Sequence, residues 1–343
     1  MEDDCVFPFS ILAHARRAQR RASRIHYNHA VPKSSHPEAG AIRRRVLAAL
    51  AENRTPGFHF PGHLLGCAWP RIGTDELEQT MLDEPLSRNV DGTTHLAALC
   101  VLLDTALATA SRLKIERGAR QATVHLHAQF TGTPLRGELK AHARMNGYTT
   151  GAAARQSLTS GTLHAGSVPA CHASGTFVVL PPPPGVDLAP LPWQRDDACA
   201  PATPLEPRAL DPGERAVLRA CDAALRRADD RHAFIEHFWG ILPVATGGGA
   251  RCTVKLGPQH ANRVRHVQGG LLLGLAAITA RAAAPRHRQL SAVAAWYISP
   301  GQGRALRIAS RRFHEGRSFA AVRTEIRNAD GARVLEVVSH HAA

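Results

Sequence analysis

One carboxylate stands inside an apolar stretch of the chain. Between positions 96 and 110 the sequence is almost entirely Ala, Leu, Val, Cys and Thr, and Asp104 is its only charged residue. Ala and Leu favour helix, and a helix that is apolar on nearly every side is a buried one. An ionised carboxylate is costly there, so Asp104 needs a polar partner, a cleft or a chemical role. A buried Asp can act as a general base or as a nucleophile.

The residues before this segment have a counterpart in the second half of the chain. In each half an Asn is followed six positions later by a polar side chain and then by a run rich in Ala and Leu. These pairs are Asn89 with His95 and Asn262 with Gln268. The residue fifteen positions after the Asn is Asp104 in the first copy and Ala277 in the second. We interpret this as an internal repeat of a domain in which only one copy keeps the charge.

The elements that would position these residues follow from periodicity and turn residues. Two buried helices are predicted at 96–111 and 269–284, and each is followed by four strand-like segments. These are 121–131, 136–146, 151–160 and 170–180, then 290–299, 304–313, 317–327 and 332–341. Ahead of the buried helices we expect helices at 39–53 and 211–238, turns and the start of a strand at 55–69, a strand or irregular chain at 74–88, and a strand at 250–256. This order predicts an α+β fold with a sheet wrapped about each central helix.

Length and composition indicate two domains. The chain has 343 residues, of which 44% are hydrophobic, enough for a sizeable core. Four consecutive prolines open a linker at 181–210, because proline fits neither a helix interior nor a central strand. The predicted domains are therefore 39–180 and 211–343. Residues 1–38 are rich in Arg and poor in apolar periodicity, which predicts a disordered basic tail.

Charge and cysteine usage indicate which binding partners and which cellular compartment to expect. The formal net charge of +14 would suit an anionic partner, but much of the excess lies in the tail. A nucleic-acid-binding tail is one alternative, although no recognised motif supports it. The seven cysteines form no CxxC pair, which is typical of reduced cytosolic thiols. The start lacks the features of a signal peptide and no apolar run is long enough to span a bilayer. We expect a cytoplasmic protein that binds neither nucleic acid nor membrane.

The two Asn-helix motifs resemble the hotdog fold, and more narrowly the acyl-CoA thioesterases of the phenylacetic-acid-degradation type. In that family Asn-x5-His-Gly-Gly leads into a central helix, and a carboxylate follows eight residues after the first Gly. The first copy here has Leu96-Ala97 in place of the glycine pair. The second keeps Gly269-Gly270 but has Gln268 in place of His and Ala277 in place of the carboxylate. The resemblance covers 55–180 and 235–343 and implies two fused hotdog domains, each an antiparallel sheet around a central helix.

The resemblance also implies where chemistry would occur. In that family the active site lies between two hotdog domains: one supplies the carboxylate, and the other supplies the Asn and a backbone N–H at the start of its helix. One complete site is then expected here, with Asp104 facing Asn262, Gln268 and Gly269. Thr123 lies near a family Ser/Thr position and is a supporting candidate. The implied reaction is hydrolysis of an acyl thioester, such as acyl-CoA.

The opposite site would be degenerate. It would hold Asn89 and His95 facing Ala277, so it lacks the carboxylate and is expected to be inactive. Each polar residue also has a structural alternative, since an Asn before a helix often stabilises a turn. Two other functions stay open. One is a non-catalytic acyl-thioester-binding protein, and the other is a hotdog hydratase or dehydratase, which uses a His with a Glu or Asp. His95 and Asp104 are both present, but together in the first copy rather than facing each other.

Other kinds of site lack support. His125 and His127 alternate on a predicted strand, but no Cys or carboxylate at ligand spacing accompanies them, so we expect no metal. The sequence has no P-loop, no Rossmann fingerprint and no GxSxG nucleophile motif, so we expect no cofactor. Two fused domains would form a pseudo-dimer within one chain, and the sequence leaves open whether such chains associate further.

Overall fold

The computed structural model describes residues 36–115, 119–149, 155–180, 189–195 and 202–343. Nearly all of the predicted basic tail and parts of the predicted linker lie outside these ranges. The helices are α1 (Ala39–Asn53), α2 (Phe60–Leu64), α3 (Leu96–Arg112), α4 (Pro212–Arg227), α5 (Phe234–Trp239) and α6 (Gly269–Ala283). Short 3-10 turns are η1 (Pro85–Ser87), η2 (Pro192–Gln194), η3 (Pro207–Ala209) and η4 (Pro258–His260).

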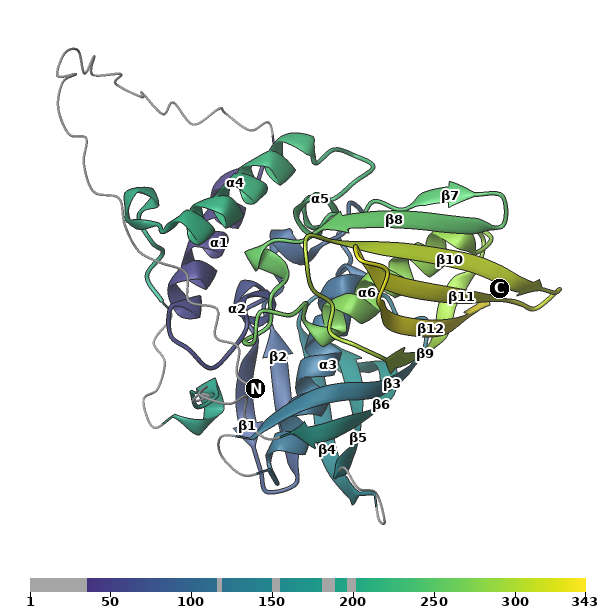
Figure 1. Cartoon of the computed structure of the whole chain (residues 1–343), viewed down its shortest axis with the longest axis horizontal. Coiled ribbons are helices and arrows are strands. Elements are labelled where there is room, and N and C mark those ends of the chain that lie inside the picture. Colours follow the sequence, from purple (N-terminus) through teal and green to yellow (C-terminus); the bar gives the residue numbers. More distant parts are fainter. Residues whose placement is uncertain (1–35, 116–118, 150–154, 181–188, 196–201) are drawn as a thin grey trace, which may run out of the picture. The chain divides into compact units, whose positions relative to one another are not determined.

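The strands of the described chain form one antiparallel sheet (Figure 1). They are β1 (Ala68–Ile72), β2 (Glu76–Met81), β3 (Arg120–Phe130), β4 (Leu139–Tyr148), β5 (Gln156–Ala165), β6 (Val168–Leu180), β7 (Val244–Thr246), β8 (Gly249–Lys255), β9 (Gln289–Tyr297), β10 (Ala305–Glu315), β11 (Phe319–Asn328) and β12 (Arg333–Ala342). The first half contributes the order β1-β2-β4-β5-β6-β3 and the second, read from its own edge, β7-β8-β10-β11-β12-β9. The two orders are the same. The halves join where β3 pairs with β9, through register pairs such as Leu126 with Ala295.

Both predicted central helices are present and buried. The helix α3 packs on β2, β4, β5 and β6, and α6 packs on β8, β10, β11 and β12. Each begins with a side chain that accepts a backbone hydrogen bond: His95 from the N–H of Ala97, and Gln268 from the N–H of Leu271. Such caps satisfy amide groups that the helix itself leaves unpaired. The prediction of two helices, each wrapped by antiparallel strands, is confirmed.

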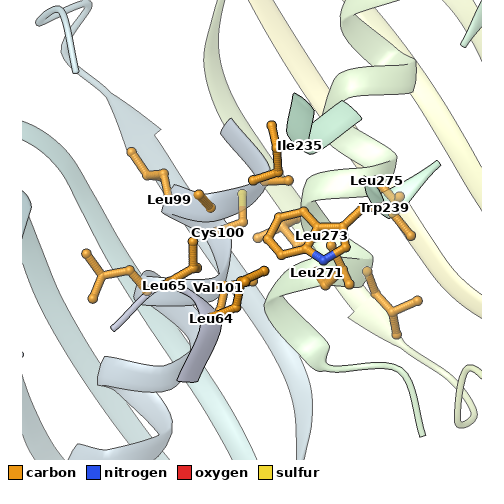
Figure 2. Packing of buried hydrophobic residues seen from close by; sticks show 14 of the residues in the cluster. Leu64, Leu65, Leu99, Cys100, Val101, Ile235, Trp239, Leu271, Leu273 and Leu275 are labelled. Atoms are coloured by element: carbon orange, nitrogen blue, oxygen red, sulfur yellow. The ribbon is translucent and has the colours of Figure 1, made fainter. Parts of the chain in front are cut away.

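The two central helices touch each other through small residues. A Cβ added to Gly270 would lie 2.2 Å from the carbonyl oxygen of Cys100, and one added to Gly274 would lie 2.6 Å from the Cα of Ala97. Glycine therefore permits backbone contact between α3 and α6 that any side chain would prevent. Around this crossing, Figure 2 shows apolar side chains from α2, α3, α5 and α6 gathered near the indole of Trp239, in one continuous core.

Some local expectations are wrong. The segment 55–69 contains the helix α2, which sequence periodicity missed because it is five residues long; Pro61 lies in its first turn, where proline is tolerated. The predicted helix at 211–238 is two helices, α4 and α5, because Asp229 accepts hydrogen bonds from the N–H groups of Arg231 and His232 and forms a turn between them. The strand expected at 151–160 is β5, which begins five residues later.

Candidate active site

A cleft of about 420 Å³ lies where the two halves meet. One wall is the second half of α3, and the start of β3 forms another. The turn before α6 and the end of β9 complete it from the second half of the chain. Phe177, Leu191 and Trp193 are among the apolar residues that line it, so a ligand would leave water as it enters.

Asp104 lies in this cleft and accepts three hydrogen bonds. Its Oδ1 accepts from the hydroxyl of Thr123 at 3.0 Å. Its Oδ2 accepts from Gln268 Nε2 at 2.7 Å and from the N–H of Gly270 at 2.9 Å. One donor thus comes from the first half and two from the second. The structure brings Asp104, Thr123 and Gln268 together, although they are far apart in the sequence.

The orientation of Gln268 follows from its two contacts. Its Oε1 accepts from the N–H of Leu271 at 2.7 Å, so the amide nitrogen must be the end that faces Asp104. The residue therefore caps α6 and binds the carboxylate at the same time. This dual role explains why a polar residue at the helix start is buried at 3% exposure.

Thr123 reaches Asp104 because β3 contains a bulge. Thr123 pairs with Phe177 and His125 pairs with Thr176, so Val124 is an extra residue between them. Side chains alternate between the faces of a strand, and Leu126 points into the core. Without the extra residue, Thr123 would point away from the helix; the bulge turns it inward.

Gly269 leaves room at the start of α6. A Cβ there would lie 3.0 Å from Asp104 Oδ2 and 3.1 Å from Thr123 Oγ1. The carbonyl of Gly269 accepts from the hydroxyl of Tyr297 at 2.8 Å. Within the described chain the N–H of Gly269 has no hydrogen-bond partner, and it belongs to a helix N-terminus that lines the cleft. Such a group can stabilise a developing negative charge.

The environment of Asp104 favours the neutral carboxyl more than water does. Burial raises the pKa of Asp104 from 3.8 to about 6, while the hydrogen bonds from Thr123, Gly270 and Gln268 act in the opposite direction. At neutral pH the carboxylate is therefore ionised, but it is a stronger base than an exposed Asp. A carboxylate with these properties is suited to accept a proton.

Both predicted Asn residues hold turns. The Oδ1 of Asn262 accepts from the N–H groups of Val264 and His266, each at 3.0 Å. The Nδ2 of Asn89 donates to the hydroxyl of Thr93 and to the carbonyl of Thr94. Asn262 nevertheless lines the cleft. In the structure its side chain shapes the turn that leads to Gln268 and makes no hydrogen bond to Asp104.

The opposite side is organised differently. The Nδ1 of His95 accepts from the N–H of Ala97, and its Nε2 lies 3.9 Å from Glu236 Oε1. Glu236 also accepts from the N–H of Ala233 and so caps α5. Ala277 is fully buried in α6. Burial lowers the pKa of His95 despite Glu236, so the histidine is neutral near pH 7. The sequence motif gave no indication of Glu236.

Several cleft residues were not predicted. Gly270, rather than Gly269, donates to Asp104, and Tyr297 positions the start of α6. Three arginines, Arg112, Arg120 and Arg263, also line the cleft. Their types are common and their spacing matches no motif, so only the folded arrangement identifies them.

Three further observations concern metal ligands, membrane-spanning helices and cysteines. In the ranges that the structure covers, no group of His, Cys, Asp and Glu is arranged to hold a metal ion. No described helix is both long and apolar enough to cross a membrane. The five cysteines of the described chain are unpaired, and four of them are buried.

Comparison with known proteins gives one family match. Residues 258–341 match the family described as the acyl-CoA thioesterase N-terminal domain, a stretch that includes Gln268, Gly269 and Gly270. Here the matching stretch lies within the second half of the chain and begins after β8. No curated protein matches the sequence.

Three similar solved structures match about four fifths of the chain at low sequence identity. A candidate oleoyl thioesterase from Lactobacillus plantarum is 12% identical with a TM-score of 0.50, covering 78% of this chain and 95% of its own. The tesB protein of Mycobacterium avium subspecies paratuberculosis is 13% identical with a TM-score of 0.45, covering 80% and 95%. A hot dog fold protein of unknown function from Alicyclobacillus acidocaldarius is 9% identical with a TM-score of 0.45, covering 80% and 95%. The chain has the α+β hotdog fold, as two hotdog-like units.

Proposed function

We propose that this protein is an acyl-CoA thioesterase with one composite site between two fused hotdog domains, 39–180 and 211–343. The observation that carries the proposal is the buried carboxylate of Asp104, held in a cleft by donors from both halves. The family match at 258–341 supports the same reaction. The identical strand orders of the two halves support an origin by tandem duplication.

The geometry suits water activation by Asp104. An ionised carboxylate offers about four acceptor positions, and three are occupied by Thr123, Gln268 and Gly270. The remaining position can bind a water molecule and take its proton. The resulting hydroxide attacks the thioester carbonyl, whose oxygen becomes negative beside the N–H of Gly269. Collapse of this intermediate breaks the carbon–sulfur bond, and the leaving thiolate takes up the proton held by Asp104. In the nucleophilic alternative, Asp104 attacks the carbonyl directly and expels the thiolate, and water then hydrolyses the mixed anhydride.

The two rival functions make different demands on the site. A hydratase that uses a His with a carboxylate would need a His beside Asp104, whereas the three donors here are a hydroxyl, an amide side chain and a backbone N–H. A non-catalytic binding protein would need no base with a raised pKa. Both features favour hydrolysis.

The decisive experiment is steady-state hydrolysis of a panel of acyl-CoAs by the wild type, Asp104→Asn and His95→Gln. We expect Asp104→Asn to lose 100-fold or more in kcat, the usual range for a positioned base being about 10²–10⁴. His95→Gln should retain activity, because His95 lies on the opposite side. Wild-type protein that binds acyl-CoA without turnover would favour the binding protein. Activity that survives in Asp104→Asn and is lost in His95→Gln would place the working site on the other side.

A further inference from the structure

Three guanidinium groups line the same cleft as Asp104. Arg112 comes from the last turn of α3, Arg120 begins β3, and Arg263 lies in the turn before α6. The Nη1 of Arg112 donates to the carbonyl of Ala119. The Nε of Arg120 and the Nη2 of Arg263 are buried without a hydrogen-bond partner in the described chain. Buried donors are nearly always satisfied, so a missing acceptor at both arginines calls for an explanation.

The charges of this cluster are not balanced by the described protein. None of the three arginines forms an ion pair with a described residue, and Asp104 is the only carboxylate among the described residues that line the cleft. Burial and the nearby charge of Arg263 lower the pKa of Arg112 to about 9. His266 also lines the cleft, and burial together with the charge of Arg120 lowers its pKa. Like charges that are brought together and partly removed from water destabilise the protein unless an anion joins them.

The cluster belongs to one side of the molecule only. The position that matches Arg263 in the first half is Val90, and the position that matches Arg112 in the second half is Pro285. Arg112 and Arg263 therefore have no arginine at the matching position of the other half. Packing common to both halves does not account for them.

We infer that Arg112, Arg120 and Arg263 form an anion-binding subsite that selects thioesters bearing a phosphate or carboxylate group. This inference rests on the proposed function, because the anion is part of the molecule that reacts at Asp104. Arg112 follows Asp104 by eight residues on α3, which places it about 12 Å further along the helix axis. A planar guanidinium binds the oxygens of either group in pairs. The anion can be a phosphate on the thiol carrier or a carboxylate at the far end of the acyl group.

The experiment compares pairs of thioesters in which one member carries an anion that the other lacks. One pair is an acyl-CoA and the same acyl-pantetheine, which lacks the phosphates and the adenosine. The second pair, both on pantetheine, is a neutral acyl chain and the same chain ending in a carboxylate. The ratio of kcat/KM within each pair measures selection for the anion in wild type, Arg263→Gln and Arg120→Gln. Arg251→Gln is the matched control, because Arg251 is exposed on β8 away from the cleft.

We expect the wild type to prefer the charged member of one pair, and the arginine variants to reduce that ratio by about 10- to 100-fold, the range for charge-assisted hydrogen bonds. A change in the first pair assigns the subsite to the carrier phosphate, and a change in the second assigns it to an acyl carboxylate. Equal rates within both pairs, or ratios that Arg263→Gln and Arg120→Gln leave as in Arg251→Gln, would overturn the inference while leaving hydrolysis intact. If the wild type hydrolyses no thioester, the proposed function fails. Calorimetric binding of coenzyme A and of succinyl-pantetheine, each lost in Arg263→Gln, would still support the subsite, and binding of neither would overturn it.

Discussion

The helices α3 and α6 occupy matching places in the two halves, yet they carry different polar residues. The first carries the carboxylate Asp104, and the second carries Ala277 at the same place. The start of α6 offers Gln268 and open glycines, whereas the start of α3 offers His95 followed by Leu96-Ala97. On the proposed function, each helix has kept only the part that faces the cleft of Asp104. When two sites are joined in one chain, each half can lose the groups that its neighbour no longer needs.

The largest effect on activity is expected when the carboxylate is moved from α3 to α6. In the double variant Asp104→Asn with Ala277→Asp, we expect activity to stay at least about 100-fold below wild type, as for Asp104→Asn alone. The matching cap, His95, is bound to the N–H of Ala97 and lies near Glu236, so a carboxylate at 277 would not find the donors that surround Asp104. Hydrolysis assays with purified double and single variants check this. Recovery to a tenth of wild-type activity would show that the halves are interchangeable.

A second test uses stability. The pKa of Asp104 is about 6 in the folded protein against 3.8 for an ordinary Asp, so the ionised form opposes folding. Stability should be unaffected below pH about 4, fall as pH rises to about 6, and then stay lower by about 3 kcal/mol. Asp104→Asn removes this cost: its oxygen can accept from Gln268 and Gly270 while its nitrogen donates to Thr123. Denaturant unfolding should show the variant to be more stable at pH 7.5 by up to about 3 kcal/mol, with a smaller gain at pH 5.

A gain from Asp104→Asn that does not change with pH would contradict this account, because a packing effect has no reason to follow a carboxyl titration. The matched variant Ala277→Asn tests the opposite side. It should be destabilising at every pH, since it buries an amide in a fully apolar position.

Substituting Thr123 should lower activity less, and it should also shift the pH profile of kcat/KM. Thr123→Val removes one donor to the ionised carboxylate, so we expect the pKa of Asp104 to rise and the acid limb of kcat/KM to move to higher pH. The loss of kcat should be about 10-fold, within the range for one hydrogen bond to a charged group. Thr279→Val is the control, because the hydroxyl of Thr279 bonds only to Leu275 in its own helix. An unshifted pH profile in Thr123→Val would mean that the bulge in β3 serves packing alone.

The smallest effects are expected from substituting the two Asn residues that hold the turns before α3 and α6. Asn89→Ala and Asn262→Ala should each lower the free energy of unfolding by about 1 kcal/mol, because each side chain satisfies polar groups of its own turn. Only Asn262→Ala should also lower activity, by a few-fold, since its turn leads to Gln268. Chemical denaturation and acyl-CoA hydrolysis of both variants provide the check. Equal activity losses would argue that both sides bind substrate.

The sequence predicted the fold better than it predicted the contacts of the site. The apolar run around Asp104 and the repeated Asn motif gave both central helices, because burial on all sides leaves a clear pattern. The short helix α2 and the break before α5 were missed, since five or six residues carry too little periodicity.

Within the site, the limits of sequence reasoning are physical. The family resemblance could select Asp104, Gln268 and Gly269, but which backbone N–H faces the carboxylate depends on how α3 and α6 cross. The sequence could not show that Thr123 faces Asp104, because its orientation depends on one extra residue in a strand. Tertiary packing alone brings the three arginines into one cleft and Glu236 to His95, and no local sequence pattern records it.

The distance between Asp104 and Gln268 along the chain also affects how the protein folds during its synthesis. Asp104 and Gln268 are separated by 164 residues, so a ribosome that adds about 5–20 residues per second completes the second roughly 10–30 s after the first. During that interval α3 has no α6 to cover its crossing face, and β3 has no β9 to pair with its edge. An unpaired strand edge is a template for association with other chains. The nascent first half is therefore the stage at which this protein is most exposed to aggregation, and a chaperone would gain most by acting there.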